Sequence, residues 1–488
     1  MDKENRTLDP RDWEKMRNLG HQMVDDLIDY WKGIQEKPIW KPIPEEVKKS
    51  LDEPIPSHHM DPQEVYNEFK ENIFPYNKGN VHPRFFAWIQ GTGTPLGTFA
   101  DLMASGMNPN VTIGEHAPMY VDKQVISWCK EMMGFPPEAS GILVSGGSMA
   151  NITALTVARN SIKGENIRKS GMSHLDKKLI LYCSTETHSC IQKAAEIIGL
   201  GSENIREIEV NEFYEMRSDL LEKQIFSDLE NGFRPFCIVG TSGTVNTGAI
   251  DPLDEILRIS RMYDLWFHVD GAYGALAKLD PIYENRLKAI EKADSLAFDL
   301  HKWFYVPYEV GCTLIRDSEK HRAAFSQTPN YLIQEKRGLA GGPDSLNHYG
   351  FELSRGFKAL KVWMSLKENG LEAYKGMIAQ NNRQAEYLGK LVESQEGLEL
   401  MAPVSMSITC YRMNPGNLPE QKLKDLNREI LLRIQEEGIA APSSTLLKGK
   451  FTLRVANVNQ RTRFEDMEIL VRETIRIGKE VLSDLDFS

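Results

Sequence analysis

The chain has 488 residues, of which 41% are hydrophobic and 26% are charged. This composition is typical of a globular protein, and a chain of this length is expected to fold into two or three domains. The formal net charge of −11 argues against binding to nucleic acid, and no apolar run approaches the roughly 18 residues of a membrane-spanning helix.

The beginning of the chain and its cysteines favour a cytoplasmic location. The first ten residues, MDKENRTLDP, are polar and mixed in charge, unlike a signal or transit peptide. The six cysteines form no CxxC pair and show no zinc-ligand spacing with histidine. We therefore expect reduced thiols in the core and no metal site.

Residues 1–80 are expected to form an N-terminal arm. Apolar residues recur at helical spacing over residues 11–33, and a Pro-rich stretch follows that cannot be helical throughout. A helix and an extended segment do not make a core by themselves, so the arm must pack on something else. We expect it to embrace a second copy of the chain; a lid on its own chain is the alternative.

From residue 81 the pattern changes to short apolar runs that alternate with amphipathic helical stretches. Strands are expected at GILV, KLILYCS, FCIVG, LWFHVD and ADSLAFD. This alternation predicts an α/β domain with a mostly parallel sheet over residues 81–370. Within it, residues 326–347 form a polar, Gly-rich loop of the length that is usually mobile or functional. Residues 371–488 then predict a small α+β domain.

Four motifs follow strands of the predicted sheet, and ligands bind at the carboxyl ends of parallel strands. The first, SGGSMAN (145–151), leads into a helix whose free N–H groups suit a phosphate, with the Ser148 hydroxyl as a further donor. A tight turn with an N-cap serine is the alternative. The second is His188 in STETHSC, which could stack on a flat ring or simply cap a loop.

The other two motifs carry a carboxylate and an amine. Asp270 in HVDGAYGA is costly to bury unless it meets a cation such as a protonated pyridine nitrogen, and the small Ala272 would leave room for a ring. Taken alone, Asp270 is more simply a turn cap. Lys302 in HKW could reach water along an apolar wall, or be a buried nucleophile. Together the four motifs fit one cofactor, pyridoxal phosphate, with Lys302 as its Schiff-base lysine.

These motifs, with HPRFFAW (82–88), TPNYL (328–332) and GFKALKVW (356–363), resemble the group II pyridoxal-phosphate-dependent decarboxylases. The likeness runs in order over about residues 10–480 and is most specific in HVDGAYGA and HKW. It implies fold type I of the pyridoxal-phosphate-dependent transferases, with a seven-stranded sheet. It also implies a homodimer with two active sites at the interface.

The resemblance assigns roles to single residues. Gly147 and Ser148 match the phosphate-binding turn, and His301 matches a histidine near the phosphate. His188 matches the histidine that stacks on the cofactor ring, Asp270 the partner of the pyridine nitrogen, and Ala272 the residue beside the ring. Lys302 matches the Schiff-base lysine, and Tyr331 matches the tyrosine that returns a proton after carbon dioxide leaves.

The substrate is expected to be an aromatic L-amino acid: tryptophan, phenylalanine, tyrosine, dopa or 5-hydroxytryptophan. Trp88 falls where the family places an aromatic residue in the substrate pocket. We expect Trp88, Phe85 and His188 to contact the substrate, with Phe86 near the pocket. Burial of at least one of these three aromatic side chains in the core is the alternative. The products would be an arylalkylamine and carbon dioxide.

Several alternatives remain at this point. Glutamate or 2,4-diaminobutyrate would need a charged partner in the pocket. An aldehyde synthase of the same family has phenylalanine in place of Tyr331, and an aminotransferase could use Arg454 for the substrate carboxylate. A non-catalytic binding protein would not need Lys302. Two positions also depart from the animal and plant enzymes: Val245 replaces a threonine near the cofactor, and Asp299 replaces an asparagine near the phosphate.

Overall fold

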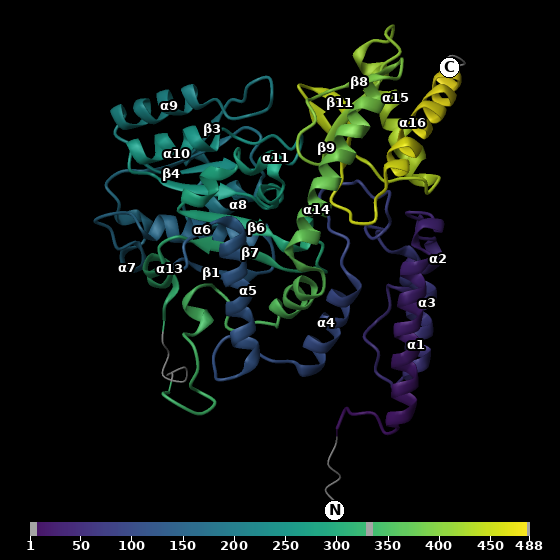
Figure 1. The fold of residues 1–488 in the computed structure, drawn as a ribbon, viewed down its shortest axis with the longest axis horizontal. Helices are drawn as coiled ribbons and strands as arrows, with labels where there is room; N and C mark the ends of the chain where they lie inside the picture. The colour runs from purple at the N-terminus through teal and green to yellow at the C-terminus, as the bar shows by residue number, and fades with distance from the viewer. Residues whose placement is uncertain (1–6, 328–334, 486–488) are drawn as a thin grey trace, which may run out of the picture.

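The computed structural model describes residues 7–327 and 335–485. Its centre is a seven-stranded sheet in the order β1-β7-β6-β5-β4-β2-β3 (Figure 1). The strands are β1 (Ser140–Val144), β2 (Leu179–Ser184), β3 (Ile205–Ile208), β4 (Arg234–Thr241), β5 (Trp266–Asp270), β6 (Ser295–Asp299) and β7 (Gly311–Ile315). Strands β2 to β6 are parallel, and β7 is antiparallel to both of its neighbours. The predicted fold class, an α/β domain with a mostly parallel sheet, is confirmed.

Helices cover both faces of this sheet. Alternate residues of a strand point to opposite faces, and in β2 Ile180 and Tyr182 join one core cluster while Leu179 and Leu181 join another. Helices α5 (Ala117–Met133), α9 (Ser218–Glu230) and α10 (Leu253–Met262) pack on the first face. Helices α6 (Gly147–Asn160) and α8 (Cys190–Ile197) pack on the second. This burial on both sides explains the continuous apolar strands.

Further helices complete the large domain. They are α4 (Pro95–Met107), α7 (Ile167–Ser170), α11 (Pro281–Glu284), α12 (Leu300–Trp303) and α13 (Ser318–Phe325). Two of these place functional groups: α12 carries the HKW motif, and α13 precedes the long loop.

The C-terminal part contains a second, antiparallel sheet in the order β10-β11-β9-β8. Its elements are β8 (Leu398–Leu400), β9 (Ile408–Met413), β10 (Ser443–Leu447), β11 (Lys450–Ala456), α15 (Glu420–Glu436) and α16 (Phe464–Leu485). Helix α14 (Ala359–Glu393) connects the two parts, and Gly370, with φ 73° and ψ 158°, interrupts it. The predicted boundary after residue 370 coincides with this interruption, and the division into domains stays a prediction.

The N-terminal arm is more helical than the sequence predicts. It contains α1 (Trp13–Lys32), α2 (Glu45–Ser50) and α3 (Pro62–Asn72). Helices α1 and α3 are joined by polar contacts, because Tyr66 Oη and Lys70 Nζ each lie 2.8 Å from Asp26 Oδ2. In Figure 1 these helices stand at the edge of the molecule, apart from the large sheet.

Three further features bear on the sequence-based expectations. No described helix combines the length and the apolar character that crossing a bilayer requires. All six cysteines are buried and free. Within the described ranges, no three His, Cys, Asp or Glu side chains gather as a metal site.

Candidate active site

A pocket of about 530 Å³ lies at the carboxyl edge of the large sheet. Residues that follow β1, β2, β4, β5 and β6 line it, because parallel strands end at the same edge of a sheet. The structure brings eight of the predicted site residues together in its lining: Trp88, Gly147, Ser148, His188, Asp270, Ala272, His301 and Lys302. Tyr331 lies outside the described residues.

The start of α6 forms a cradle for an anion. Its N-cap, Gly146, makes no side-chain cap, and the first N–H groups of a helix have no intrahelical partner. A Cβ atom at Gly147 would lie 2.9 Å from both Ala272 Cβ and Asp299 Oδ2, so only glycine fits. The partial positive charge of the helix end completes a site that suits a phosphate.

Lys302 presents its amine to the same pocket. Its side chain is 22% exposed, and Nζ lies 2.8 Å from Asp299 Oδ2. Burial lowers the pKa of the ammonium, but the charge and hydrogen bond of Asp299 and the charge of Asp270 outweigh this effect and raise the pKa above its ordinary value. A Cβ atom at Gly91 would lie 2.0 Å from the carbonyl oxygen of His301, so this glycine lets the chain pass close to the backbone of His301 and Lys302.

Asp270 is almost completely buried at the end of β5. Its Oδ1 accepts a hydrogen bond from the Ala272 N–H at 3.1 Å, so it does cap the following turn. Its Oδ2 lies 3.8 Å from the Sγ atom of Cys190. The carboxylate also lines the pocket, where a protonated ring nitrogen could pair with it.

A buried chain of hydrogen bonds runs behind Asp270. Trp266 Nε1 donates to Ser295 Oγ at 2.7 Å, and Ser295 Oγ lies 2.8 Å from His268 Nδ1. His268 Nε2 lies 2.6 Å from Asn151 Oδ1, and Asn151 Nδ2 donates to Cys190 Sγ at 3.4 Å. Because an amide oxygen only accepts, His268 carries its proton on Nε2. Burial lowers the pKa of His268 to about 4, so the imidazole is neutral.

The sequence did not predict this chain of hydrogen bonds. Its one visible signal is that His268 precedes Asp270 by two residues in the strand, on the same face of the sheet. The partners Asn151, Cys190 and Ser295 come from three other elements, and no local pattern marks them.

Two histidines and one unpredicted tyrosine flank the amine. His188 is open to the pocket; its Nδ1 accepts from the Cys190 N–H at 3.1 Å, and the surrounding protein lowers its pKa although Asp270 opposes this effect. His301 Nδ1 lies 3.1 Å from the Val310 nitrogen and 3.0 Å from the Val310 carbonyl oxygen. Its ring lies 4.5 Å, centroid to centroid, from the ring of Tyr308, which also lines the pocket.

The aromatic residues predicted for the substrate divide between the pocket and the core. Trp88 lines the pocket with a left-handed backbone (φ 54°), and Lys78 Nζ lies 4.2 Å from its ring. Phe85 does not line it: a bridge to Ala441 turns Phe85 into a small core with Ile39 and Ala87. Its ring nevertheless lies 6.3 Å, centroid to centroid, from that of Trp88, and a contact between Phe85 and the substrate stays a prediction. Phe86 is fully buried in the core of the C-terminal part.

The Arg454 side chain donates hydrogen bonds to backbone carbonyl groups in this structure. It is 2% exposed, Nη1 donates to the carbonyl oxygen of Trp88 at 3.0 Å, and Nε donates to that of Asn246 at 3.2 Å. It is not among the residues that line the pocket. Val245 does line it, and its aliphatic side chain can make no hydrogen bond there.

These residues fit pyridoxal phosphate. The glycine turn and the start of α6 suit its phosphate, Asp270 suits its ring nitrogen, and Lys302 offers an amine to its aldehyde. The carboxylate of Asp299 lies against the phosphate cradle, and its charge opposes a phosphate beside it.

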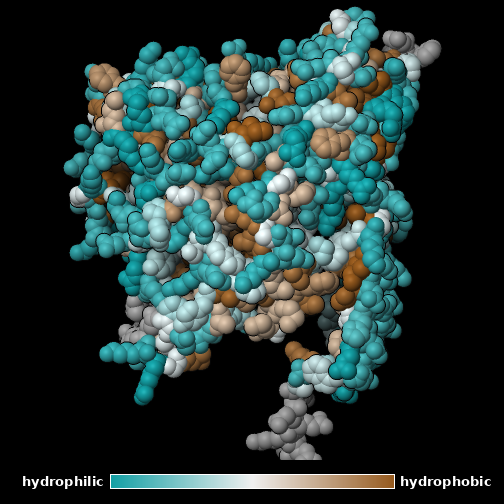
Figure 2. Space-filling view, viewed as in Figure 1, coloured by the Kyte–Doolittle hydropathy of each residue, from teal (hydrophilic) through white to brown (hydrophobic). Residues whose placement is uncertain are grey.

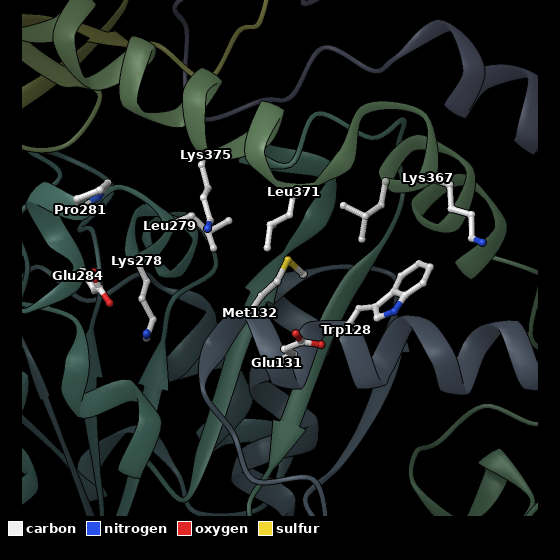
Figure 3. Close-up of a pocket in the computed structure, with 11 residues that line it drawn as sticks. Trp128, Glu131, Met132, Lys278, Leu279, Pro281, Glu284, Lys367, Leu371 and Lys375 are labelled. Atoms are coloured by element: carbon white, nitrogen blue, oxygen red, sulfur yellow. The ribbon is translucent and has the colours of Figure 1, made fainter.

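A second pocket, also of about 530 Å³, lies between α5, α11 and α14 (Figure 3). Its apolar wall includes Trp128 and Met132. Two of its lysines form ion pairs: Lys278 Nζ lies 2.9 Å from Glu291 Oε1, and Lys375 Nζ lies 2.7 Å from Glu372 Oε1. The third, Lys367, lies over the Trp363 ring, with Nζ 4.8 Å from the centroid. None of the predicted site residues that the structure describes lines this pocket.

Comparisons with known proteins agree with the geometry. The pyridoxal-dependent decarboxylase conserved domain matches residues 44–414. An aromatic-L-amino-acid decarboxylase of Bacillus atrophaeus is 34% identical over 472 residues, 96% of this chain and 96% of that protein. A phenylacetaldehyde synthase of Arabidopsis thaliana is 29% identical over 462 residues, 92% of this chain and 93% of that protein. The crystal structure of Oryza sativa TDC with PLP and tryptamine shares the fold, with a TM-score of 0.89, 24% identity and coverage of 97% of this chain and 100% of that chain. This chain belongs to the family of pyridoxal-dependent decarboxylases.

Proposed function

We propose that this chain removes carbon dioxide from aromatic L-amino acids and releases the corresponding arylalkylamines. Membership of the family makes it a carboxy-lyase with pyridoxal phosphate as its cofactor. The pocket lining carries the aromatic part of the proposal: Trp88 lies in it, and Lys302 is the one lysine or arginine among its described residues. An aromatic substrate side chain would find an aromatic wall there, and Lys78, the cation beside Trp88, already lies over its ring with Nζ 4.2 Å from the centroid.

The residues of the chain divide the work of the reaction. When bound, pyridoxal phosphate supplies an aldehyde that condenses with an amine and a ring that accepts electrons from the breaking bond. We assign phosphate binding to the start of α6, including Gly147 and Ser148. Asp270 holds the proton on the ring nitrogen, and Cys190, which faces its Oδ2, supports the negative charge. His188 lies against the ring in this proposal.

Tyr331 is proposed as the acid that returns a proton to the α-carbon. The support is its place in TPNYL, which matches the family motif. This tyrosine also argues against an aldehyde synthase, because those enzymes carry phenylalanine at the matching position. An aminotransferase is disfavoured because Arg454 already donates to two backbone carbonyl groups.

We further propose that the working unit is a homodimer in the cytoplasm. Helix α4 exposes more than half of each of Leu102, Met103 and Met107, and Figure 2 shows hydrophobic side chains gathered where α4 lies in Figure 1. Exposed apolar patches of this kind are typical of interfaces. The arm adds exposed Trp13 and Phe69. The six free thiols support a reducing compartment.

A product assay tests the function. The protein with pyridoxal phosphate is incubated separately with L-tryptophan, L-phenylalanine, L-tyrosine, L-dopa, L-5-hydroxytryptophan and L-glutamate, and products are identified by mass while carbon dioxide is measured. We expect amine and carbon dioxide from at least one aromatic acid. Lys302→Ala should abolish turnover and the visible absorbance of the bound cofactor, and Tyr331→Phe should divert product from amine to aldehyde.

The other outcomes separate the alternatives. Aldehyde and ammonia from the unmodified protein would assign it to the synthases. A keto acid without carbon dioxide would indicate an aminotransferase. Amine from glutamate alone would contradict our interpretation of the pocket.

A further inference from the structure

The pocket contains a buried carboxylate, Asp299, that the assigned roles leave unexplained. It ends β6 and directly precedes α12, which carries Lys302. Its side chain is only 2% exposed, and Oδ2 lies 2.8 Å from Lys302 Nζ. Its other oxygen, Oδ1, is buried and has no hydrogen-bond partner among the described residues. Lys302 is therefore its principal partner, with His301 Nε2 further away at 3.8 Å.

The surroundings hold this carboxylate in place. A Cβ atom at Gly311 would lie 2.7 Å from Oδ1, and one at Gly147 would lie 2.9 Å from Oδ2, so Asp299 fills the space that these two glycines leave. It has little room to turn away from the lysine. The titratable groups that lie around the pair are His188, Cys190, Asp270, His301, Tyr308 and Cys312.

The pair has a consequence for the reactivity of the amine. A lysine can attack an aldehyde only after its ammonium has lost a proton. Burial favours that loss, but Asp299 opposes it, and the net effect raises the pKa of Lys302. In the protein without cofactor, Lys302 is thus an ammonium ion at neutral pH. An asparagine in place of Asp299 would keep the shape of the site and remove this constraint.

We propose that Asp299 is a positioning residue that holds Lys302 as an ammonium ion, so that attachment of an aldehyde-bearing phosphate ester waits for the loss of one proton from the pair. In attachment, the ammonium releases a proton to solvent, the lone pair of Nζ forms a bond to the aldehyde carbon, and the aldehyde oxygen leaves as water. This inference rests on the cofactor chemistry of the proposed function and is independent of the amino acid substrate.

The test measures cofactor loading in the absence of substrate. The full-length protein, freed of cofactor, is mixed with pyridoxal phosphate or with pyridoxal, which lacks the phosphate, and visible absorbance is followed between about pH 6 and pH 10. We expect Asp299→Asn to load both aldehydes faster at neutral pH, by about tenfold for each unit by which the pKa of Lys302 falls. The rate of the unmodified protein should still rise with pH where that of the variant has levelled off.

Glu309→Gln is the matched control. Glu309 is exposed and lies 3.0 Å from Lys358 Nζ, so the variant also loses one negative charge near the pocket but leaves the Asp299–Lys302 pair intact. It should keep the pH profile of the unmodified protein. The same shift in both variants would overturn a specific role for Asp299.

Two other results would overturn the proposal. Faster loading of pyridoxal phosphate with unchanged loading of pyridoxal would mean that Asp299 acts by repelling the phosphate. Unchanged pH profiles for both aldehydes would leave Asp299 a structural role only. If Asp299→Asn does not fold, the pH dependence of the unmodified protein tests the proposal instead. A rate of pyridoxal loading that stops rising below about pH 9 would show that Lys302 is not held as an ammonium ion. A protein that binds the cofactor with the expected pH profile but does not decarboxylate aromatic amino acids would contradict the proposed function and leave this inference intact.

Discussion

Asp270 shows how a single buried charge is supported in this molecule. One oxygen accepts the N–H of Ala272, and the other faces the thiol of Cys190. Behind the thiol, neutral His268 donates from Nε2 to Asn151 Oδ1, and Asn151 Nδ2 donates to Cys190 Sγ, so each donor points toward Asp270. Such donors stabilise a carboxylate, and a carboxylate is what a protonated ring nitrogen needs. The turn cap made by Asp270 is therefore compatible with its proposed cofactor role.

Asp270→Asn tests this support. The variant keeps the size of the side chain and removes the negative charge, so we expect kcat to fall about 100-fold or more. The visible absorbance of the bound cofactor should persist, because Lys302 is untouched. Cys190→Ala, which removes a donor and not the charge, should cost only a few-fold. An Asp270→Asn enzyme with more than half of its activity would exclude the assigned role.

At the scale of elements, one imidazole joins the segments on either side of the long loop. His321 lies in α13, its Nδ1 is 2.8 Å from Ser140 Oγ at the start of β1, and its Nε2 is 2.8 Å from the carbonyl oxygen of Tyr349. Since a carbonyl oxygen accepts, Nε2 carries the proton and Nδ1 accepts from the serine. Burial lowers the pKa of His321 from 6.5 to about 4.

This lowered pKa predicts how a variant depends on pH. The unfolded chain binds a proton at His321 below about pH 6.5, whereas the folded protein does so only near pH 4, so the contribution of the neutral imidazole is present above pH 6.5 and is lost as the pH falls. We expect the free energy of unfolding of His321→Gln, relative to the unmodified protein, to increase by up to about 3 kcal/mol from pH 7 to pH 4. Urea unfolding at several pH values measures this difference. His58→Gln, in an exposed part of the arm, is the control. A constant difference across this range would contradict the buried neutral state.

At the scale of the whole molecule, the arm and α4 leave apolar surface uncovered. Helices α1 and α3 hold each other through Asp26, yet Trp13 and Phe69 remain exposed. The arm reaches its own chain at Ile39, whose N–H donates to the carbonyl oxygen of Gly438 at 3.0 Å. A second copy that covers these surfaces would bury the exposed face of α4.

Leu102→Glu tests the proposed dimer. A carboxylate on α4 would have to be buried unpaired in the interface, so we expect the variant to sediment as a monomer and to lose most of its activity. Leu229→Glu is the matched control: Leu229 is also exposed, but it lies in α9 on the large domain, and its replacement should leave the mass unchanged. A monomeric unmodified protein would overturn the dimer itself.

The sequence by itself determined the parallel sheet and most of the pocket, because the information for both is local. Continuous apolar strands reveal burial on two faces, and SGGSMAN, HVDGAYGA and HKW each place their polar residue within a few positions of a strand end. Because parallel strands end at the same edge of a sheet, these residues then lie close together.

Only the tertiary structure decided which groups meet one another. The bridge between Phe85 and Ala441 places Phe85 in a small core, whereas Trp88, three positions further along the chain, lines the pocket. Cys190 meets Asp270 from a different element, and Gly147 and Gly311, from two further elements, leave the space that Asp299 occupies beside Lys302. Side-chain partners depend on the distances between elements that no local pattern contains, and burial then sets the charge that each partner carries.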